Sequence, residues 1–172
     1  MSYADALRFL ESDGPIARDE VKRLIDSGDL LTWSVVYTLT GKEWARIQPE
    51  IALEDQLDFM RRYLLRCIEE NPAPTDYLHG GFEAAWELAA SMKRWRTIGG
   101  RTSTILRGIA IDLEKMYRRV EPAAKNRILC GVLEHVFEDP AARTYFANWD
   151  RDGDLRDAYR LAVEWGSAHE EE

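Results

Sequence analysis

Apolar residues recur along most of this chain at alternating steps of three and four, the spacing of residues that share one face of an α-helix. The clearest stripe consists of Leu53, Leu57, Met60, Leu64 and Cys67. A second stripe of the same period consists of Leu106, Ile109, Leu113, Met116 and Val120. Both stripes predict amphipathic helices that bury one face against the rest of the protein.

Proline and glycine mark where further helices begin and end. Helices are predicted to open near Pro15, Pro49, Pro122 and Pro140, where the missing backbone N–H of proline costs nothing. The helix after Gly80-Gly81 is expected to end at Gly99 and to turn inward Phe82, Ala85, Trp86 and Ala89. The helix from Pro122 is expected to be the most central, because its stripe is doubled: Leu129, Val132, Leu133, Val136 and Phe137. The last helix carries Leu155, Tyr159, Ala162 and Val163.

The stretch Leu30 to Leu39 is ambiguous, since it is rich in β-branched and aromatic residues and periodicity cannot separate a buried helix from a strand. We predict a helix, because the chain offers no second strand to pair with it. The sequence therefore predicts an all-α protein, a multi-helix bundle or short irregular helical array of about eight or nine helices. Residues 1–172 are expected to form a single helical domain that ends in an acidic tail, 167–172.

Charge is distributed in blocks. The chain carries a net charge of −8, but residues 1–87 contribute −8, residues 88–133 contribute +7 and residues 134–172 contribute −7. The basic block contains the candidate binding residues, a tryptophan among cations: Lys93, Arg94, Trp95, Arg96, Arg101 and Arg107. Such a segment suits an acidic partner or a phosphate. The alternative is that these cations pair with acidic residues of the same chain. The overall acidity argues against nucleic acid as a partner.

No catalytic set, cofactor or metal site is predicted. Asp76 and His79 form one Asp-x-x-His spacing, and a di-iron bundle needs far more ligands. The segment from Asn148 to Tyr159 matches part of a calcium-binding EF-hand loop, but Tyr159 stands where a bidentate Glu belongs, so no calcium binding is expected. Asp154 is expected to cap the last helix instead. Ser103 or Thr102 is expected to cap the helix after Gly99-Gly100.

The location of the protein is predicted from what the sequence lacks. No window approaches 18 consecutive apolar residues, and no secretory signal is recognisable at Met1. The two cysteines, Cys67 and Cys130, lie in apolar helical patterns and are expected to be buried thiols. We therefore expect a cytoplasmic protein that does not bind a membrane.

The segment Asn126-Arg127-Ile128-Leu129-Cys130-Gly131-Val132-Leu133-Glu134, followed by an aromatic-containing helix and Trp165, forms one further pattern. Over the last quarter of the chain it resembles the small all-helical immunity proteins encoded beside bacterial toxins. The chain departs from their pattern in lacking an acidic cluster directly around this segment. The resemblance implies a toxin-neutralising or other protein-binding role, with no catalytic residues.

Two functional hypotheses follow. The first is a protein-interaction module, of immunity type, whose acidic faces bind a basic partner and whose exposed tryptophans anchor it. The second is a helical enzyme or binder of a small anionic ligand that uses the basic segment 93–107. A deep cavity lined by Arg, His and Trp favours the second. Pairing of the basic side chains with acidic residues of the same chain favours the first.

Overall fold

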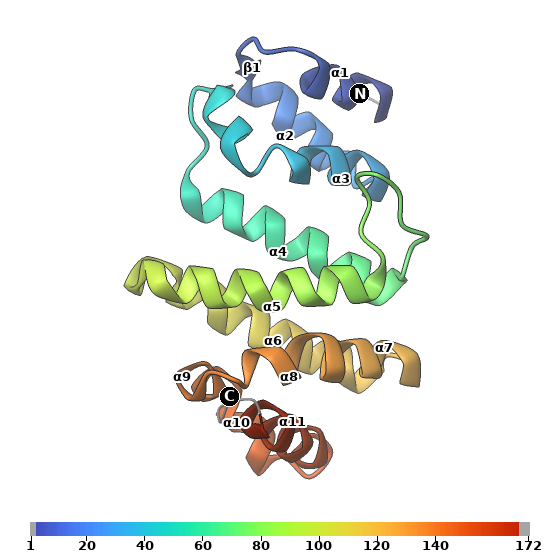
Figure 1. The fold of residues 1–172 in the computed structure, drawn as a ribbon. Coiled ribbons are helices and arrows are strands. Elements are labelled where there is room, and N and C mark those ends of the chain that lie inside the picture. The colour runs from blue at the N-terminus through green and yellow to red at the C-terminus, as the bar shows by residue number, and fades with distance from the viewer. Residues whose placement is uncertain (1–2, 169–172) are drawn as a thin grey trace.

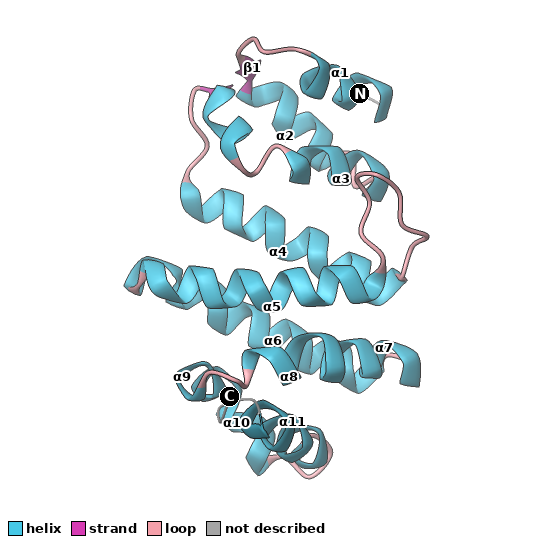
Figure 2. Ribbon diagram, in the orientation of Figure 1, coloured by secondary structure: helices cyan, strands magenta, loops and turns pink. Residues whose placement is uncertain are grey.

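The computed structural model describes residues 3–168, except for the side chain of Lys42, and helices dominate the described chain (Figure 2). The main helices are α1 (Tyr3–Glu11), α2 (Arg18–Asp26), α3 (Leu30–Thr38), α4 (Leu53–Glu70), α5 (Gly81–Ile98), α6 (Ser103–Arg119) and α11 (Arg156–Ala168). Shorter helical segments are η1 (Lys42–Arg46), η2 (Gly100–Thr102), α7 (Pro122–Asn126), η3 (Arg127–Leu133), α8 (Glu134–Val136), α9 (Pro140–Arg143), η4 (Thr144–Phe146) and α10 (Ala147–Arg151). The predicted all-α class is confirmed. Of the predicted acidic tail, residues 169–172 lie outside the described residues.

The helices follow one another along an elongated molecule (Figure 1). Helices α1 to α3 form one end, α4 and α5 cross the middle, and α9 to α11 form the other end. The most extensive packing joins α4 to α5 and α5 to η3. This arrangement is an irregular helical array, and α5 is its central element. Among the described residues, no helix is both long and apolar enough to cross a membrane.

The ambiguous stretch after Asp29 is a helix, as predicted. The Asp29 carboxylate accepts the backbone N–H of Thr32 at 2.7 Å and so caps α3. Burial extends around much of the helix, since Trp33, Val35 and Val36 are all in the core. A helix that is apolar on all sides is one that neighbours surround, which explains the missing periodicity.

Two short strands were not predicted, and they correct the helix starts near Pro15 and Pro49. Strand β1 (Ile16–Ala17) pairs in parallel with β2 (Ile47–Gln48), in the register Ile16 to Ile47. Helix α2 then begins at Arg18 and α4 at Leu53. Both isoleucines are buried, and their burial stabilises the strand pair. Strands of two residues are too short to produce a recognisable alternation in the sequence.

The inward face predicted for α5 is wrong at its aromatic positions. Phe82 and Trp86 are 37% and 52% exposed, whereas Ala85 and Ala89 are buried. Close packing decides the face: a Cβ on Gly131 of η3 would lie 2.5 Å from the Cβ of Ala85. Small residues therefore form the contact stripe, and the aromatic rings are displaced to its edge.

The helix from Pro122 packs against α5 but is not the most central element, because that place belongs to α5, and its regular period is interrupted. Val132, Leu133, Val136 and Phe137 are fully buried, as predicted. Leu129 is only half-buried, which corrects its place in the stripe, and Ile128 is buried instead. The segment Arg127–Leu133 is a π-helix, whose wider turn shifts the phase of the buried face.

The two cysteines differ. Cys67 is buried, and burial raises the pKa of its thiol to about 12. Cys130 is only half-buried, so the expectation of a buried thiol was wrong there. Its thiol lies 3.2 Å from the side-chain oxygen of Asn126. Both are free thiols.

Candidate functional site

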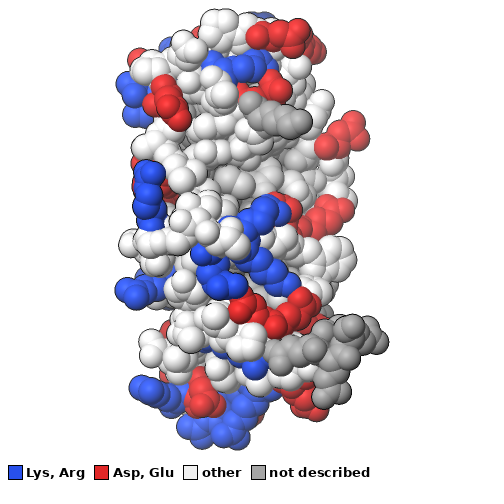
Figure 3. Space-filling view, turned by 60° about the vertical axis from the view of Figure 1, so that its left-hand side comes forward, with Lys and Arg blue, Asp and Glu red and all other residues white. Residues whose placement is uncertain are grey.

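The basic segment 93–107 is mostly neutralised within the fold. Lys93 pairs with Glu138 at 2.5 Å and Arg96 with Asp139 at 2.5 Å. Ion pairs also join Arg94 to Glu87 at 2.6 Å and Arg101 to Glu54 at 2.8 Å. Figure 3 shows Lys and Arg side chains gathered at the middle of one face, directly beside Asp and Glu side chains. Four of the five cations thus face acidic residues of their own chain.

The other two candidates lie apart. Trp95 is 4% exposed and belongs to the core. Arg107 is exposed and lines a shallow cavity with Ile111 and Tyr145, on the side of α6 that faces η4. The six candidates therefore do not form one open groove. Arg94 and Trp95 nevertheless both line a different site, together with residues that were not predicted as site residues.

That site is a cleft between α3, α4, α5 and the loop 71–80, which we name the α3–α4–α5 cleft. Its volume is about 680 Å³. Its apolar wall consists of Leu53, Leu57, Met60, Trp95 and Ile98. Its polar and aromatic wall consists of Tyr37, Asp76, Tyr77, His79, Glu87 and Arg94. An apolar cavity with a few convergent polar groups is the usual form of a small-molecule site.

A hydrogen-bonded network fixes Glu87 at one side of the cleft. Its Oε1 atom accepts from the Tyr37 hydroxyl at 3.1 Å, the Ser91 hydroxyl at 3.2 Å and Arg94 Nη2 at 2.6 Å. Arg94 Nη2 also donates to the buried Ser91 Oγ at 2.9 Å. The carboxylate is therefore held in one orientation before any ligand arrives.

His79 is held by a second, aromatic group. The hydroxyl of fully buried Tyr63 lies 2.9 Å from His79 Nδ1 and accepts the backbone N–H of His79 at 3.2 Å. The rings of Tyr37, Tyr63 and His79 contact one another, with centroids 4.7 to 5.6 Å apart. The imidazole thus packs between elements that belong to different parts of the sequence.

The loop that carries His79 is anchored at both ends. Asn71 adopts a left-handed conformation with φ of 46° and ends α4, and its Oδ1 accepts the backbone N–H of Gly81 at 3.1 Å. Glu83 Oε2 accepts the backbone N–H of Gly80 at 2.8 Å at the start of α5. These contacts bring the histidine to the same side as Glu87.

Burial keeps the titratable rings of the cleft neutral. It raises the pKa of the Tyr37 hydroxyl, with a further contribution from Glu87, and it raises the pKa of the Tyr63 hydroxyl. Burial also lowers the pKa of His79. At neutral pH the cleft therefore offers neutral hydrogen-bonding rings beside one oriented carboxylate.

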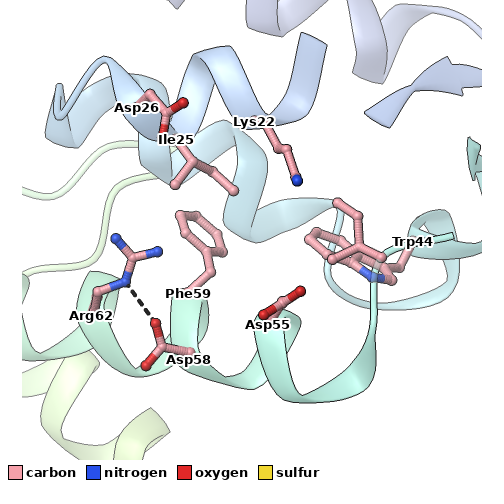
Figure 4. A pocket seen from close by; sticks show the side chains of 9 residues that line it. Lys22, Ile25, Asp26, Trp44, Asp55, Asp58, Phe59 and Arg62 are labelled. Atoms are coloured by element: carbon pink, nitrogen blue, oxygen red, sulfur yellow. Dashed lines mark ion pairs between the residues drawn. The ribbon is translucent and has the colours of Figure 1, made fainter. Parts of the chain in front are cut away.

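A second cavity lies between α2 and α4 and measures about 340 Å³ (Figure 4). Lys22 and Asp55 extend toward it from opposite sides, with Phe59 and Trp44 between them in the wall, while Arg62 pairs with Asp58 at 3.0 Å. Lys22 and Asp55 are both exposed. This cavity is smaller and lacks a buried polar network, so it is the weaker candidate.

The segment predicted to resemble a calcium loop is structured differently. Residues up to Arg151 form α10, and the following turn is closed by Asp152, whose Oδ1 accepts the backbone N–H of Asp154 at 2.9 Å. Asp152 also pairs with Arg118 at 2.6 Å. The Asp152 carbonyl accepts the backbone N–H of Arg156, the first residue of α11, at 2.9 Å, so Asp152 and not the predicted Asp154 contacts the start of the last helix. Within residues 3–168, no three His, Cys, Asp or Glu residues are grouped as metal ligands.

The predicted cap of α6 also needs correction. Thr102 occupies the N-cap position, but its hydroxyl donates to the carbonyl oxygens of Trp95 at 2.7 Å and Gly99 at 2.9 Å. It therefore ties the end of α5 to the start of α6 and does not cap the N–H groups of α6.

Comparisons with models of protein families, with curated proteins and with solved structures give no match. The sequence pattern associated His79 with Asp76 alone, and Tyr37, Tyr63 and Glu87 were not among the predicted site residues. The hydroxyl of Tyr37 meets Glu87 across 50 positions of sequence. No local spacing rule encodes such a contact.

Proposed function

We propose that this protein binds a small organic molecule in the α3–α4–α5 cleft. The ligand's apolar body lies against Leu57, Met60 and Ile98, and its polar end lies at His79 and Glu87. The observation that carries the proposal is the oriented carboxylate of Glu87, fixed by three donors at the edge of an apolar cavity of about 680 Å³. Arg, His and Trp in the wall of a cavity favour ligand binding, whereas the pairing of four basic side chains with acidic residues of the same chain favours the interaction module, which is kept below as the second candidate.

The proposal is tested with N-phenyl-1-naphthylamine, a neutral fluorophore that brightens in apolar cavities. Thr38 is exposed and lines the cleft, so Thr38→Trp fills the cavity without altering the core. We expect this variant to weaken binding by at least about tenfold, which is 1.4 kcal/mol. Thr104→Trp, at an exposed threonine of α6, is the matched control and should bind as the wild type does. Equal binding by both variants would place the fluorophore elsewhere and refute the proposal.

An exposed aromatic pair supports a second candidate function, the docking of a protein partner. Phe82 and Trp86 lie side by side on α5, with ring centroids 6.0 Å apart, and Trp86 is half exposed. Next to Trp86 is a cavity of about 420 Å³ that Lys93 and His135 help to line. Exposed tryptophan is the residue most often found as an interface anchor. The net charge of −8 favours a basic partner, as does the resemblance to immunity proteins.

This second candidate is tested by cross-linking in the source cell with the wild type, Trp86→Ala and Ile111→Ala. Ile111 is 50% exposed on α6 and serves as the matched control. We expect a basic protein to be captured by the wild type and Ile111→Ala and lost in Trp86→Ala. Capture by all three proteins would exclude this surface as the docking site.

A further inference from the structure

The charged groups that line the α3–α4–α5 cleft point to a particular class of ligand. Its wall contains two carboxylates, Glu87 and Asp76, and one cation, Arg94. Burial lowers the pKa of His79, so its imidazole contributes no positive charge at neutral pH. The wall of the cleft thus carries a net negative charge, although Arg94 of the basic segment belongs to it.

Arg94 is poorly placed to bind an anion. Its Nη2 atom is engaged with Glu87 and Ser91, at 2.6 Å and 2.9 Å. Its side chain is 57% exposed, so water screens the remaining charge. An anionic ligand would also have to approach Glu87, which lies within the same ion pair.

Glu87, in contrast, has a carboxylate oxygen that can accept a hydrogen bond from a ligand. The Tyr37 hydroxyl, the Ser91 hydroxyl and Arg94 all reach its Oε1 atom, which leaves Oε2 as the acceptor for a ligand. Its side chain is 32% exposed, so the carboxylate is accessible from the cleft while its orientation is fixed. A charge-assisted hydrogen bond to such a carboxylate is about twice as strong as a neutral one.

The aromatic wall suits the same chemistry. Tyr37 and Tyr77 belong to the same polar and aromatic wall as Glu87 and Asp76. The faces of such rings carry partial negative charge and attract organic cations. Carboxylates beside aromatic rings therefore form a site for an ammonium group, with the apolar wall left for the rest of the ligand.

We propose that the ligand of the α3–α4–α5 cleft is an organic amine, whose ammonium group is bound by Glu87, with Asp76 as a second negative charge in the wall, and whose apolar body lies against Leu57, Met60 and Ile98. This inference rests on the proposed function, because it names the class of molecule that the same cleft binds. It differs from the anionic ligand expected from the basic segment, since the cations of that segment are paired within the fold.

The test compares three probes with one skeleton: 3-phenylpropylammonium, 3-phenylpropanol and 3-phenylpropanoate. Each competes with N-phenyl-1-naphthylamine for the wild-type protein at pH 7. We expect the ammonium probe to bind about fivefold to tenfold more tightly than the alcohol, and the carboxylate probe to bind most weakly. A carboxylate probe that binds best, three equal affinities, or no displacement by the ammonium probe would each overturn the inference. Binding of the fluorophore itself, blocked by Thr38→Trp, tests the proposed function separately.

Two variants assign the effect to the carboxylates. Glu87→Gln keeps the hydrogen-bonding shape but removes the charge, and Asp76→Asn does the same at an exposed loop position. Each is expected to reduce the preference for the ammonium probe over the alcohol about threefold or more. Glu164→Gln, at an exposed glutamate of α11, is the control and should leave the preference intact. An unchanged preference in both cleft variants would contradict the assignment, and Asp76→Asn keeps the test valid if Glu87→Gln folds poorly.

Discussion

The α3–α4–α5 cleft and the basic segment 93–107 share Arg94 and Trp95, but their polar side chains are arranged differently. In the segment, Lys93 and Arg96 pair with neighbouring residues of the turn between α8 and α9, and Arg101 pairs with Glu54 of α4, so the cations are directed to two separate places. In the cleft, Tyr37, His79 and Glu87 come from separate elements and converge. A run of like charges in this segment therefore indicates ion pairs with neighbouring elements. The candidate site, in contrast, is formed by side chains that are far apart in the sequence and close in the fold.

The largest expected effect separates the buried Trp95 from the charged residues next to it in the basic segment. Trp95 is 4% exposed, so Trp95→Ala should lower the free energy of unfolding by about 3 to 5 kcal/mol through lost burial and a cavity. Arg96→Ala, one position along, removes a surface ion pair and should cost less than about 1 kcal/mol. Urea-induced unfolding measures both. Similar losses in the two variants would mean that the segment is not divided between core and surface in this way.

The next effect concerns the neutral imidazole of the cleft. Because burial lowers the pKa of His79, the folded protein holds fewer protons there than the unfolded chain does. Its contribution to stability is complete above the unfolded value of about 6.5, and it falls as the pH drops toward the folded pKa, by at most about 1.4 kcal/mol per pH unit.

The measurement is the free energy of unfolding between about pH 5 and pH 8. His79→Gln should flatten the pH dependence of the free energy of unfolding at pH values below about 6.5, which is the ordinary pKa of histidine. His135→Gln, at a side chain that is 41% exposed and lies outside the cleft, is the matched control. The opposite pattern would place the titrating group outside the cleft.

A smaller effect is expected when one hydrogen bond of the Glu87 network is removed. Tyr37→Phe deletes the hydroxyl that donates to Glu87 Oε1 at 3.1 Å and should cost about 0.5 to 1.5 kcal/mol. Tyr145→Phe, at a half-buried tyrosine far from the cleft, is the control. Thermal unfolding compares the two. No loss in Tyr37→Phe would indicate that Glu87 is oriented without this bond, which would weaken the case for a prearranged carboxylate.

Local periodicity predicted the buried faces of α4 and α6, because side chains three and four apart share one face whatever the helix packs against. It failed for Trp86, where alanines permit close contact between helices, and for Leu129, where a π-helical turn shifts the phase. The cleft was beyond prediction for another reason. His79 reaches Tyr63 across 16 positions and a loop, and Tyr37 reaches Glu87 across 50. Such contacts follow from how helices stack, which no single stripe specifies.

The smallest effect tests whether the ion pairs of the basic segment serve only to neutralise charge. Arg96 and Asp139 lie 2.5 Å apart, with side chains 39% and 22% exposed. A double-mutant cycle with Arg96→Gln and Asp139→Asn should give a coupling energy of about 0.2 to 1 kcal/mol. Because salt screens exposed charges beyond about 8 Å at physiological ionic strength and weakens such pairs, the coupling should shrink as salt rises. A coupling above about 2 kcal/mol that salt does not change would indicate a buried pair with a structural role. In that case the segment would resemble the Glu87 network, and the contrast between the two regions would no longer hold.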